Sequence, residues 1–253
     1  MAPVVYLVSG ANRGIGFGLV KALSSREDTI VFAGVRDPDA ATDLQSFAAD
    51  KPGRVHIVKL VSSDAKGNEE AISFIREKAG RLDVVIANAG INYAYGPLYK
   101  AAEEDLRTHF EVNVVGTFVL FKAALPLLKA SSASGSAPPK FVAVSSHGGS
   151  LERGASAPFD MAPYGISKAA LNYLVRKLHY EHEKDRLVAF PISPGPVTTD
   201  MGSYGVEHDA GIRNLDFKTV DEIAAPLLKV IGNATRESEG GHFLNFDGAK
   251  IPW

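Results

Sequence analysis

The sequence predicts an α/β fold: one parallel sheet of about seven strands, doubly wound by helices on both faces (a Rossmann fold). Two observations predict it. Short apolar or β-branched segments recur along the 253 residues, and the segments between them carry apolar residues at three- and four-residue spacing. Because the strands are apolar throughout, both faces of the sheet should be covered. Right-handed crossovers then place binding residues at the carboxyl ends of the strands.

Each element follows from this pattern. Helices are predicted between the strands, and the two longest are expected at about 102–129 and 163–184. The segment SSASGSAPP (131–139) has the composition of a linker, but a strand of the same pattern follows, so it is interpreted as a surface loop within one domain, 1–253. The Gly-rich stretch 196–217 has weak periodicity and is expected to form a substrate lid. The strands are predicted at 4–9, 29–34, 54–60, 82–88, 140–146, 187–193 and 241–246.

Composition excludes several classes of protein. The formal net charge of −2 gives no reason to expect nucleic acid or an anionic membrane as a partner. The chain has no cysteine, so disulfides and thiolate metal sites are excluded, and no metal site is predicted. The opening MAPVVYLVSG lacks the basic lead of a signal peptide, and no apolar stretch approaches the roughly 20 residues that span a bilayer. We expect a soluble, cytoplasmic protein.

A glycine-rich loop follows the first strand. SGANRGIG (9–16) places glycines at 10, 14 and 16, between a predicted strand and a predicted helix. Glycines there allow a sharp turn and a close approach to a pyrophosphate, and the helix N-terminus offers free N–H groups to phosphates. The alternative is an ordinary glycine-rich turn. The strand before and the helix after favour a dinucleotide site.

The second strand ends on a basic residue where NAD-binding folds carry an acidic one. Counting about 20 positions from the glycine loop reaches Arg36, whose guanidinium suits a 2′-phosphate. Arg13 adds a second positive charge. Two solvated arginines are the alternative interpretation, and Asp37 could instead contact a ribose hydroxyl. The pattern favours NADP(H).

Three Tyr/Lys pairs, each four residues apart, lie within 164–184: Tyr164/Lys168, Tyr173/Lys177 and Tyr180/Lys184. At about 100° per residue, the second and third tyrosines fall roughly opposite the first on a helix. Only one face can meet a bound cofactor. The first pair follows the helix start and lies soon after the fifth strand, so it is the expected reactive pair.

Six motifs are spread over almost the whole chain. Their order resembles that of the short-chain dehydrogenases/reductases and, within that family, of fungal ketoreductases of the norsolorinic acid ketoreductase type and sniffer-like carbonyl reductases. The motifs are SGANRGIG (9–16), ANAG (87–90), VNVVGTF (112–118), VSSHGG (144–149), YGISK (164–168) and PGPVTTDM (194–201).

The resemblance implies a catalytic tetrad of Asn113, Ser146, Tyr164 and Lys168. Tyr164 is the implied general acid/base. Its pKa, ordinarily about 10, should be lowered by the Lys168 ammonium and an oxidised nicotinamide. Lys168 would also bind the nicotinamide ribose, Ser146 the carbonyl oxygen, and Asn113 a water that links Lys168 to solvent. Ser145 is the alternative donor, but strand alternation sends the two serines to opposite faces.

The resemblance also implies the residues that bind the cofactor. Departures from the family pattern are Val61, where relatives carry an adenine-binding Asp, and a longer gap between Ser146 and Tyr164. Asp64 is given no role. The implied cofactor-binding residues are Gly10, Asn12, Arg13, Gly14, Ile15, Gly16, Arg36, Asn88, Ala89, Gly90, Tyr164, Lys168, Pro194, Gly195, Val197 and Thr199.

The expected activity is NADPH-dependent reduction of a ketone or aldehyde. The expected pocket walls, 92–98, 147–162 and 200–217, are aromatic and hold few charges, which suits an uncharged, apolar or aromatic carbonyl substrate. The alternatives are an NAD-linked alcohol or hydroxysteroid-type dehydrogenase and a catalytically silent NADP(H)-binding regulatory protein. The resemblance further implies a homodimer or homotetramer.

Overall fold

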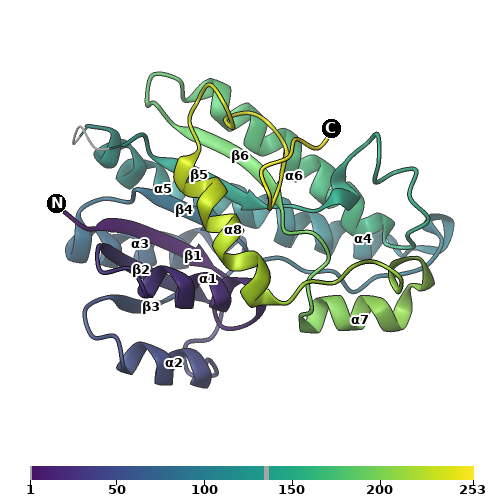
Figure 1. Cartoon of the computed structure of the whole chain (residues 1–253), viewed down its shortest axis with the longest axis horizontal. Helices are drawn as coiled ribbons and strands as arrows, with labels where there is room; N and C mark the ends of the chain where they lie inside the picture. The colour runs from purple at the N-terminus through teal and green to yellow at the C-terminus, as the bar shows by residue number, and fades with distance from the viewer. Residues whose placement is uncertain (1, 134–136) are drawn as a thin grey trace.

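Seven parallel strands form one sheet in the order β3-β2-β1-β4-β5-β6-β7 (Figure 1). The computed structural model describes residues 2–133 and 137–253. The order reverses between β1 and β4, which makes this the switch point where ligands bind at the carboxyl ends of the strands. The fold class expected from the sequence is confirmed. The strands are β1 (Val4–Ser9), β2 (Thr29–Val35), β3 (Val55–Lys59), β4 (Val84–Ala87), β5 (Lys140–Val144), β6 (Val188–Ser193) and β7 (Leu244–Asn245).

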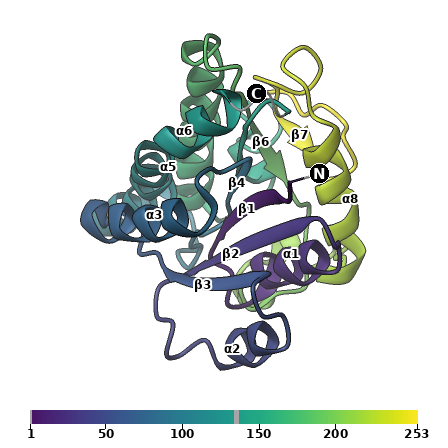
Figure 2. The same ribbon diagram turned by 90° about the vertical axis from the view of Figure 1, so that its left-hand side faces the viewer.

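Helices cover both faces of the sheet (Figure 2). One face carries α1 (Gly14–Ser24), α2 (Thr42–Ala49) and α8 (Val220–Asn233). The other carries α3 (Ala65–Ala79), α5 (Gly116–Ala133) and α6 (Ala162–Glu181). The remaining helical segments are α4 (Glu103–Phe110), the π-helical turn η2 (Glu111–Val115), α7 (Asp200–His208) and the 3₁₀ turns η1 (Leu98–Lys100), η3 (His147–Gly149) and η4 (Ala210–Ile212).

Strand alternation divides the core into two layers. In β1, Tyr6 and Val8 pack under α1 and α8, whereas Val5 and Leu7 pack under α3, α5 and α6. All four are at most 5% exposed. Burying such side chains stabilises the fold by roughly 1.5–3 kcal/mol each, so the strand ends that carry the site are held by apolar packing on both sides.

Some element ends differ from expectation, although the first six strands agree to within two residues. The last strand, expected at 241–246, pairs only at Leu244–Asn245, because the chain turns at Gly241 (φ 70°). The helix expected to reach 184 ends at Glu181, ahead of a turn in which Arg186 has φ 56°. Of the loop expected at 131–139, residues 131–133 extend α5 and 134–136 lie outside the described residues.

The continuous helical run Glu103–Ala133 is long and apolar enough to cross a membrane by length and composition, with a mean hydropathy of 1.5 over its best window. The expectation that no segment reaches this threshold is therefore wrong. Half of that window is buried inside the protein, and Leu120, Phe121 and Leu127 belong to the core. The run is a covering helix of the sheet, and the fold is that of a soluble enzyme.

Candidate active site

The glycine loop packs directly on the end of β4. Gly10 and Gly14 have φ of 64° and 54°, which favours glycine. A Cβ on Gly16 would lie 2.2 Å from the Gly10 carbonyl oxygen, and one on Gly10 would lie 2.9 Å from the Ala89 Cα. Helix α1 begins at Gly14, so its free N–H groups face the loop. Of the loop's other residues, Asn12 is exposed and Ile15 packs against the core.

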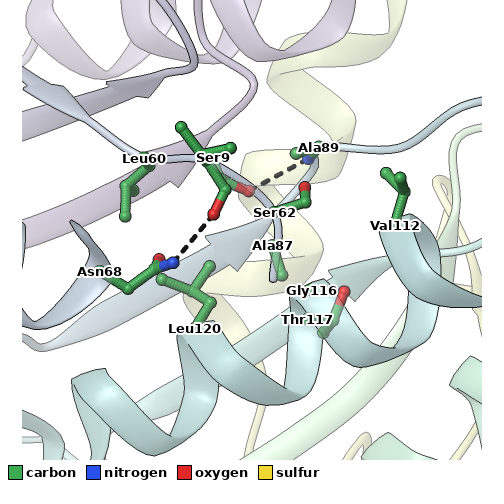
Figure 3. Close-up of a pocket in the computed structure, with 11 residues that line it drawn as sticks. Ser9, Leu60, Ser62, Asn68, Ala87, Ala89, Val112, Gly116, Thr117 and Leu120 are labelled. Atoms are coloured by element: carbon green, nitrogen blue, oxygen red, sulfur yellow. Dashed lines mark hydrogen bonds between the residues drawn. The ribbon is translucent and has the colours of Figure 1, made fainter. Parts of the chain in front are cut away.

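Ser9 locks the ends of β1 and β4 together (Figure 3). Its hydroxyl oxygen accepts hydrogen bonds from the N–H groups of Asn88 (3.0 Å) and Ala89 (3.1 Å). The Asn88 amide in turn donates to the carbonyl oxygens of Ser9 and Gly10 at 3.0 and 3.1 Å. No local pattern in the sequence distinguishes Ser9. Its role depends on the neighbouring strand, which only the tertiary structure supplies.

A cavity of about 20 Å³ lies beside this junction and is lined by Ser9, Ser62, Asn68 and Thr117 among others (Figure 3). It is large enough for one water molecule and too small for a nucleobase. Asn68 donates to the carbonyl oxygens of Val61 and Asp64 and so fixes the loop after β3. The Asp64 carboxylate accepts from Gly67 N–H and caps α3, which agrees with giving Asp64 no binding role.

Arg36 and Asp37 have different surroundings at the end of β2. Both are exposed. The Asp37 carboxylate accepts hydrogen bonds from the N–H groups of Asp39 (3.1 Å) and Ala40 (3.4 Å), so it stabilises its own turn. Arg36 forms no ion pair within residues 2–133 and 137–253. Of these two side chains, the Arg36 guanidinium is therefore the one available to bind an anion.

Arg13 is differently placed, because its guanidinium pairs with the Asp200 carboxylate at 2.6 Å. Both side chains are more than 70% exposed (72% and 74%). Asp200 is the first residue of α7, so this pair joins the glycine loop to the segment expected to form a lid. The sequence analysis did not anticipate this partner.

Asn113 lies in the π-helical turn and is fully buried. Its Oδ1 accepts from Ile91 N–H (2.9 Å), and its Nδ2 donates to the Ile91 carbonyl oxygen (3.0 Å) and to Ser167 Oγ (2.9 Å). π-turns are frequent at functional sites. The amide therefore clamps the loop after β4 to α6. A Cβ on Gly90 would lie 3.1 Å from Asn113 Oδ1 and 3.4 Å from Lys168 Nζ, so a side chain there would crowd both groups.

The two serines after β5 diverge, as strand alternation requires. Ser145 is 2% exposed and donates to Asn172 Oδ1 at 2.6 Å, so it serves packing against α6. Ser146 shares a side-chain hydrogen bond with Tyr164 and also accepts from Gly148 N–H at 3.1 Å. Ser146, not Ser145, lies beside the candidate acid/base.

Helix α6 brings only the first Tyr/Lys pair inward. Tyr173 and Tyr180 are 73% and 57% exposed. Lys177 pairs with Glu181 on the surface. Lys168, in contrast, is 3% exposed, donates to the Val144 carbonyl oxygen at 2.9 Å and lies 5.5 Å above the centre of the Tyr164 ring.

Burial sets the proton affinities of this pair. It raises the pKa of Tyr164 to about 12, and the hydrogen bond with Ser146 only partly opposes it. Burial lowers the pKa of Lys168 to about 8. The expectation that the lysine lowers the pKa of Tyr164 is not met in this structure, because desolvation of the phenol outweighs it.

The segment after β6 lies over the glycine loop. Gly195, which follows Pro194, has φ 72°, and Val197 is 6% exposed. Thr199 caps α7 by accepting from Gly202 N–H, and a Cβ on Gly14 would lie 3.3 Å from its methyl group. The lid expected at 196–217 contains α7 and η4. Beneath it, His147 Nδ1 lies 2.9 Å from Ser193 Oγ, and burial lowers the pKa of His147.

The expected pocket walls meet one another. Gly96 N–H donates to the Asp160 carbonyl oxygen at 2.7 Å, which joins 92–98 to 147–162. The buried Asp209 carboxylate accepts from the N–H groups of Asp160 and Gly211, both at 2.8 Å, which ties the same loop to the lid. Sequence reasoning missed Asp209, because a single carboxylate in a loop gives no local signal of its partners.

The chain is similar to known proteins over most of its length. A family model described as short chain dehydrogenase matches residues 4–209. Norsolorinic acid ketoreductase from Aspergillus parasiticus is 36% identical, with 98% of this chain and 91% of the relative covered. An NADPH-bound carbonyl reductase from chicken fatty liver is similar with a TM-score of 0.88 and 30% identity, covering 100% of this chain and 96% of the other. Carbonyl reductase Sniffer of D. melanogaster has a TM-score of 0.88 and 26% identity, with both chains fully covered.

Proposed function

The chain belongs to the short-chain dehydrogenase family and is an oxidoreductase of carbonyl or alcohol groups; on that premise we propose that it reduces a ketone or aldehyde to an alcohol with NADPH. The observation that carries the proposal is the meeting of Ser146, Tyr164 and Lys168 at the carboxyl ends of β4 and β5. A dinucleotide sensor would need the glycine loop but not this buried phenol and ammonium.

The chain's residues supply the proton and the polar contacts for such a reduction. Ser146 holds the carbonyl oxygen and stabilises the charge that develops on it. Tyr164 donates its phenolic proton to that oxygen, and its raised pKa keeps the phenol protonated until then. Lys168, with a pKa of about 8, can return a proton to the phenolate near neutral pH. Asn113 holds Ile91 and Ser167 around this pair, and a relay role for it remains part of the proposal.

The glycine loop fits a nicotinamide dinucleotide, which supplies the hydride when bound. Side chains at positions 10 and 16 would collide with the backbone of Ala89 and Gly10, so the loop keeps the close turn that a pyrophosphate would need. The adenosine half of the cofactor would lie beside Asn88, Ala89 and Gly90. The nicotinamide half would lie beside Pro194, Gly195, Val197 and Thr199. Arg36 supports NADP(H) over NAD(H), because it is exposed without an ion-pair partner in the described chain, while Asp37 is engaged by its own turn.

Cofactor oxidation with a panel of ketones and aldehydes tests the proposal. We expect NADPH to support turnover and Tyr164→Phe to lower kcat by about 10³-fold while NADPH still binds. Equal turnover with NADH would favour the NAD-linked dehydrogenase. Cofactor binding without turnover of any carbonyl would favour the silent regulatory protein, and full activity of Tyr164→Phe would exclude its role as proton donor.

Three further features belong to the proposal. The first is a single domain over 1–253 whose segment 196–217 covers the substrate. The second is a homodimer or homotetramer formed through α4, α5 and α6, whose outer faces leave Phe110, Phe118 and Ile166 between 40% and 47% exposed. Sedimentation in solution tests it, and a monomer would contradict it. The third is a cytoplasmic location.

A further inference from the structure

A second tyrosine lies near the proposed site, on the loop 92–98 that follows β4. Gly96, next to Tyr95, forms a bridge with Met161, and a Cβ on Gly148 would lie 3.0 Å from the Met161 methyl group and 3.5 Å from Ser146 Oγ. Helix α7 lies directly against Tyr95, since a Cβ on Gly205 would come within 2.8 Å of the Tyr95 hydroxyl oxygen. The loop that carries Tyr95 therefore joins the surroundings of Ser146 to the segment expected to form the lid.

The side chain of Asn92 orients this hydroxyl. Asn92 Nδ2 donates to the Tyr95 hydroxyl oxygen at 2.8 Å and lies 3.9 Å from Met161 Sδ. A thioether can only accept, so the nitrogen is the end of the amide that faces both groups. Because the Tyr95 oxygen accepts from Asn92, its own proton is directed elsewhere. It donates to no acceptor in the described part of the chain.

The orientation of the Asn92 amide leaves its oxygen without a partner in the described part of the chain. Asn92 Oδ1 is buried and finds no hydrogen-bond partner among residues 2–133 and 137–253. Leaving a buried acceptor unsatisfied costs about 1–3 kcal/mol, so such a group calls for an explanation. Positioning of the Tyr95 proton supplies one. Burial and the neighbouring Tyr164 also raise the pKa of Tyr95, which keeps it a neutral donor.

Two aromatic rings of α7 lie beside the ring of Tyr95. The rings of Tyr204 and His208, both on α7, stack with centroids 3.9 Å apart. The Tyr95 ring lies 5.9 Å from Tyr204 and 6.0 Å from His208. Such a wall binds flat aromatic groups by stacking and supplies few charges. The Tyr95 hydroxyl is a hydrogen-bond donor beside these rings. Such an arrangement favours an aromatic ligand that carries an oxygen atom as acceptor.

We propose that Tyr95, held in orientation by Asn92, donates a hydrogen bond to a second oxygen of the substrate, and that the substrate is therefore an aromatic ketone or aldehyde carrying an oxygen substituent. The reacting carbonyl meets Ser146 and Tyr164, while the second oxygen meets Tyr95. The inference rests on the proposed function, since it assigns specificity to that same cleft.

Matched ketones test the role of Tyr95. The panel is acetophenone with a methoxy group at the 2′, 3′ or 4′ position, each paired with the ethyl analogue, which has the same size and lacks the acceptor. We expect wild type to favour methoxy over ethyl in kcat/KM at one position by about three- to tenfold, the value of one neutral hydrogen bond. Tyr95→Phe should abolish that preference, whereas Tyr173→Phe, on the exposed face of α6, should retain it.

Asn92→Leu tests the positioning role. It should remove the same preference as Tyr95→Phe, and the double variant should lose no more than either single one, because both changes remove one interaction. An unchanged preference in Tyr95→Phe, or equal losses on methoxy and ethyl ketones, would overturn the proposal.

Binding without turnover separates this inference from the proposed function. Calorimetry of the same ketone pairs on the NADP⁺-loaded chain should show tighter binding of the methoxy member in wild type and equal binding in Tyr95→Phe. If no ketone is reduced but this difference appears, the proposed function fails and the Tyr95 subsite stands. If ketones are reduced and the difference is absent, the subsite fails alone.

Discussion

The floor of the cleft and its roof are built differently. The floor consists of Asn113, Ser146, Tyr164 and Lys168, and Asn113 and Lys168 are at most 3% exposed. Their hydrogen bonds join segments far apart in sequence, such as Asn113 to Ser167 and Lys168 to Val144. The roof consists of 92–98 and 200–212, where Tyr93, Met201 and Tyr204 are 37–41% exposed.

The roof is held mainly at its ends. Thr199 caps the start of α7, Asp209 ties its far end to 147–162, and stacked rings fill the space between. A buried, cross-linked floor suits chemistry that needs fixed geometry, whereas a partly exposed roof can vary in side chains without disturbing it. We therefore expect the floor to determine the type of reaction and the roof to determine which substrates bind.

After Tyr164→Phe, the largest effect is expected in the floor, from Lys168→Met. Removing the buried ammonium should lower kcat by about 10²-fold, because the proton of Tyr164 is no longer replaced. Since burial lowers the Lys168 pKa from 10.5 to about 8, the folded state disfavours its charge, and the variant should be more stable than wild type below pH 8 by about 1–3 kcal/mol.

The sign of the pH dependence follows from proton counts. Between about pH 8 and 10.5 the unfolded wild-type chain binds the proton that the native chain has lost, so wild-type stability rises with pH. The advantage of Lys168→Met should therefore shrink over that window, which denaturant titrations at several pH values can measure. An advantage that grows with pH would contradict the burial of a charged Lys168.

The next effect is expected at the rim, from Arg36→Asp. Replacing a free guanidinium with a carboxylate should shift the NADPH-over-NADH preference by about 10²-fold toward NADH, because a 2′-phosphate would then meet a like charge. Fluorescence titration of both cofactors measures it. Arg76→Asp, an equally exposed change on α3, is the matched control. An unchanged preference for NADPH over NADH would show that Arg36 does not bind the 2′-phosphate.

The smallest effect is expected where the roof meets the glycine loop, from Asp200→Asn. Releasing Arg13 from its exposed ion pair should tighten NADPH binding by about two- to fivefold, which corresponds to the interaction free energy of exposed ion pairs. The gain should be smaller at high salt, because salt screens the charges. NADH binding should change less, since NADH lacks the 2′-phosphate. The gain should vanish in an Arg13→Ala background, and persistence there would exclude competition between Asp200 and the cofactor for Arg13.

Local patterns in the sequence predicted the fold class. Strand alternation and helical rotation predicted that only one of the two serines and one of the three tyrosines could face the cleft. The family resemblance then selected Ser146, and the position of Tyr164 at the helix start, soon after the fifth strand, selected that tyrosine; Ser145 packs against α6, and Tyr173 and Tyr180 are exposed. The glycine loop was also predictable, since its geometry is fixed within eight residues.

The remaining features depend on tertiary contacts. The rise in the pKa of Tyr164 caused by burial could not be predicted from the sequence, because desolvation is set by what packs around the phenol. The clamp made by Asn113 needs a π-turn and a loop 22 residues away. Asp209 and the Asn92–Tyr95 pair were missed, because their partners lie on other segments or carry no recognisable motif.

A crystal structure with NADPH bound tests the central claim most directly. We expect the nicotinamide to lie beside Tyr164, with its reactive carbon within roughly 5 Å of the phenol oxygen, leaving room for a carbonyl at reacting distance. Lys168 should reach the nicotinamide ribose, and Arg36 the 2′-phosphate. A nicotinamide that instead meets Tyr173 or Tyr180, or a Tyr164 hydroxyl turned away from it, would contradict the account.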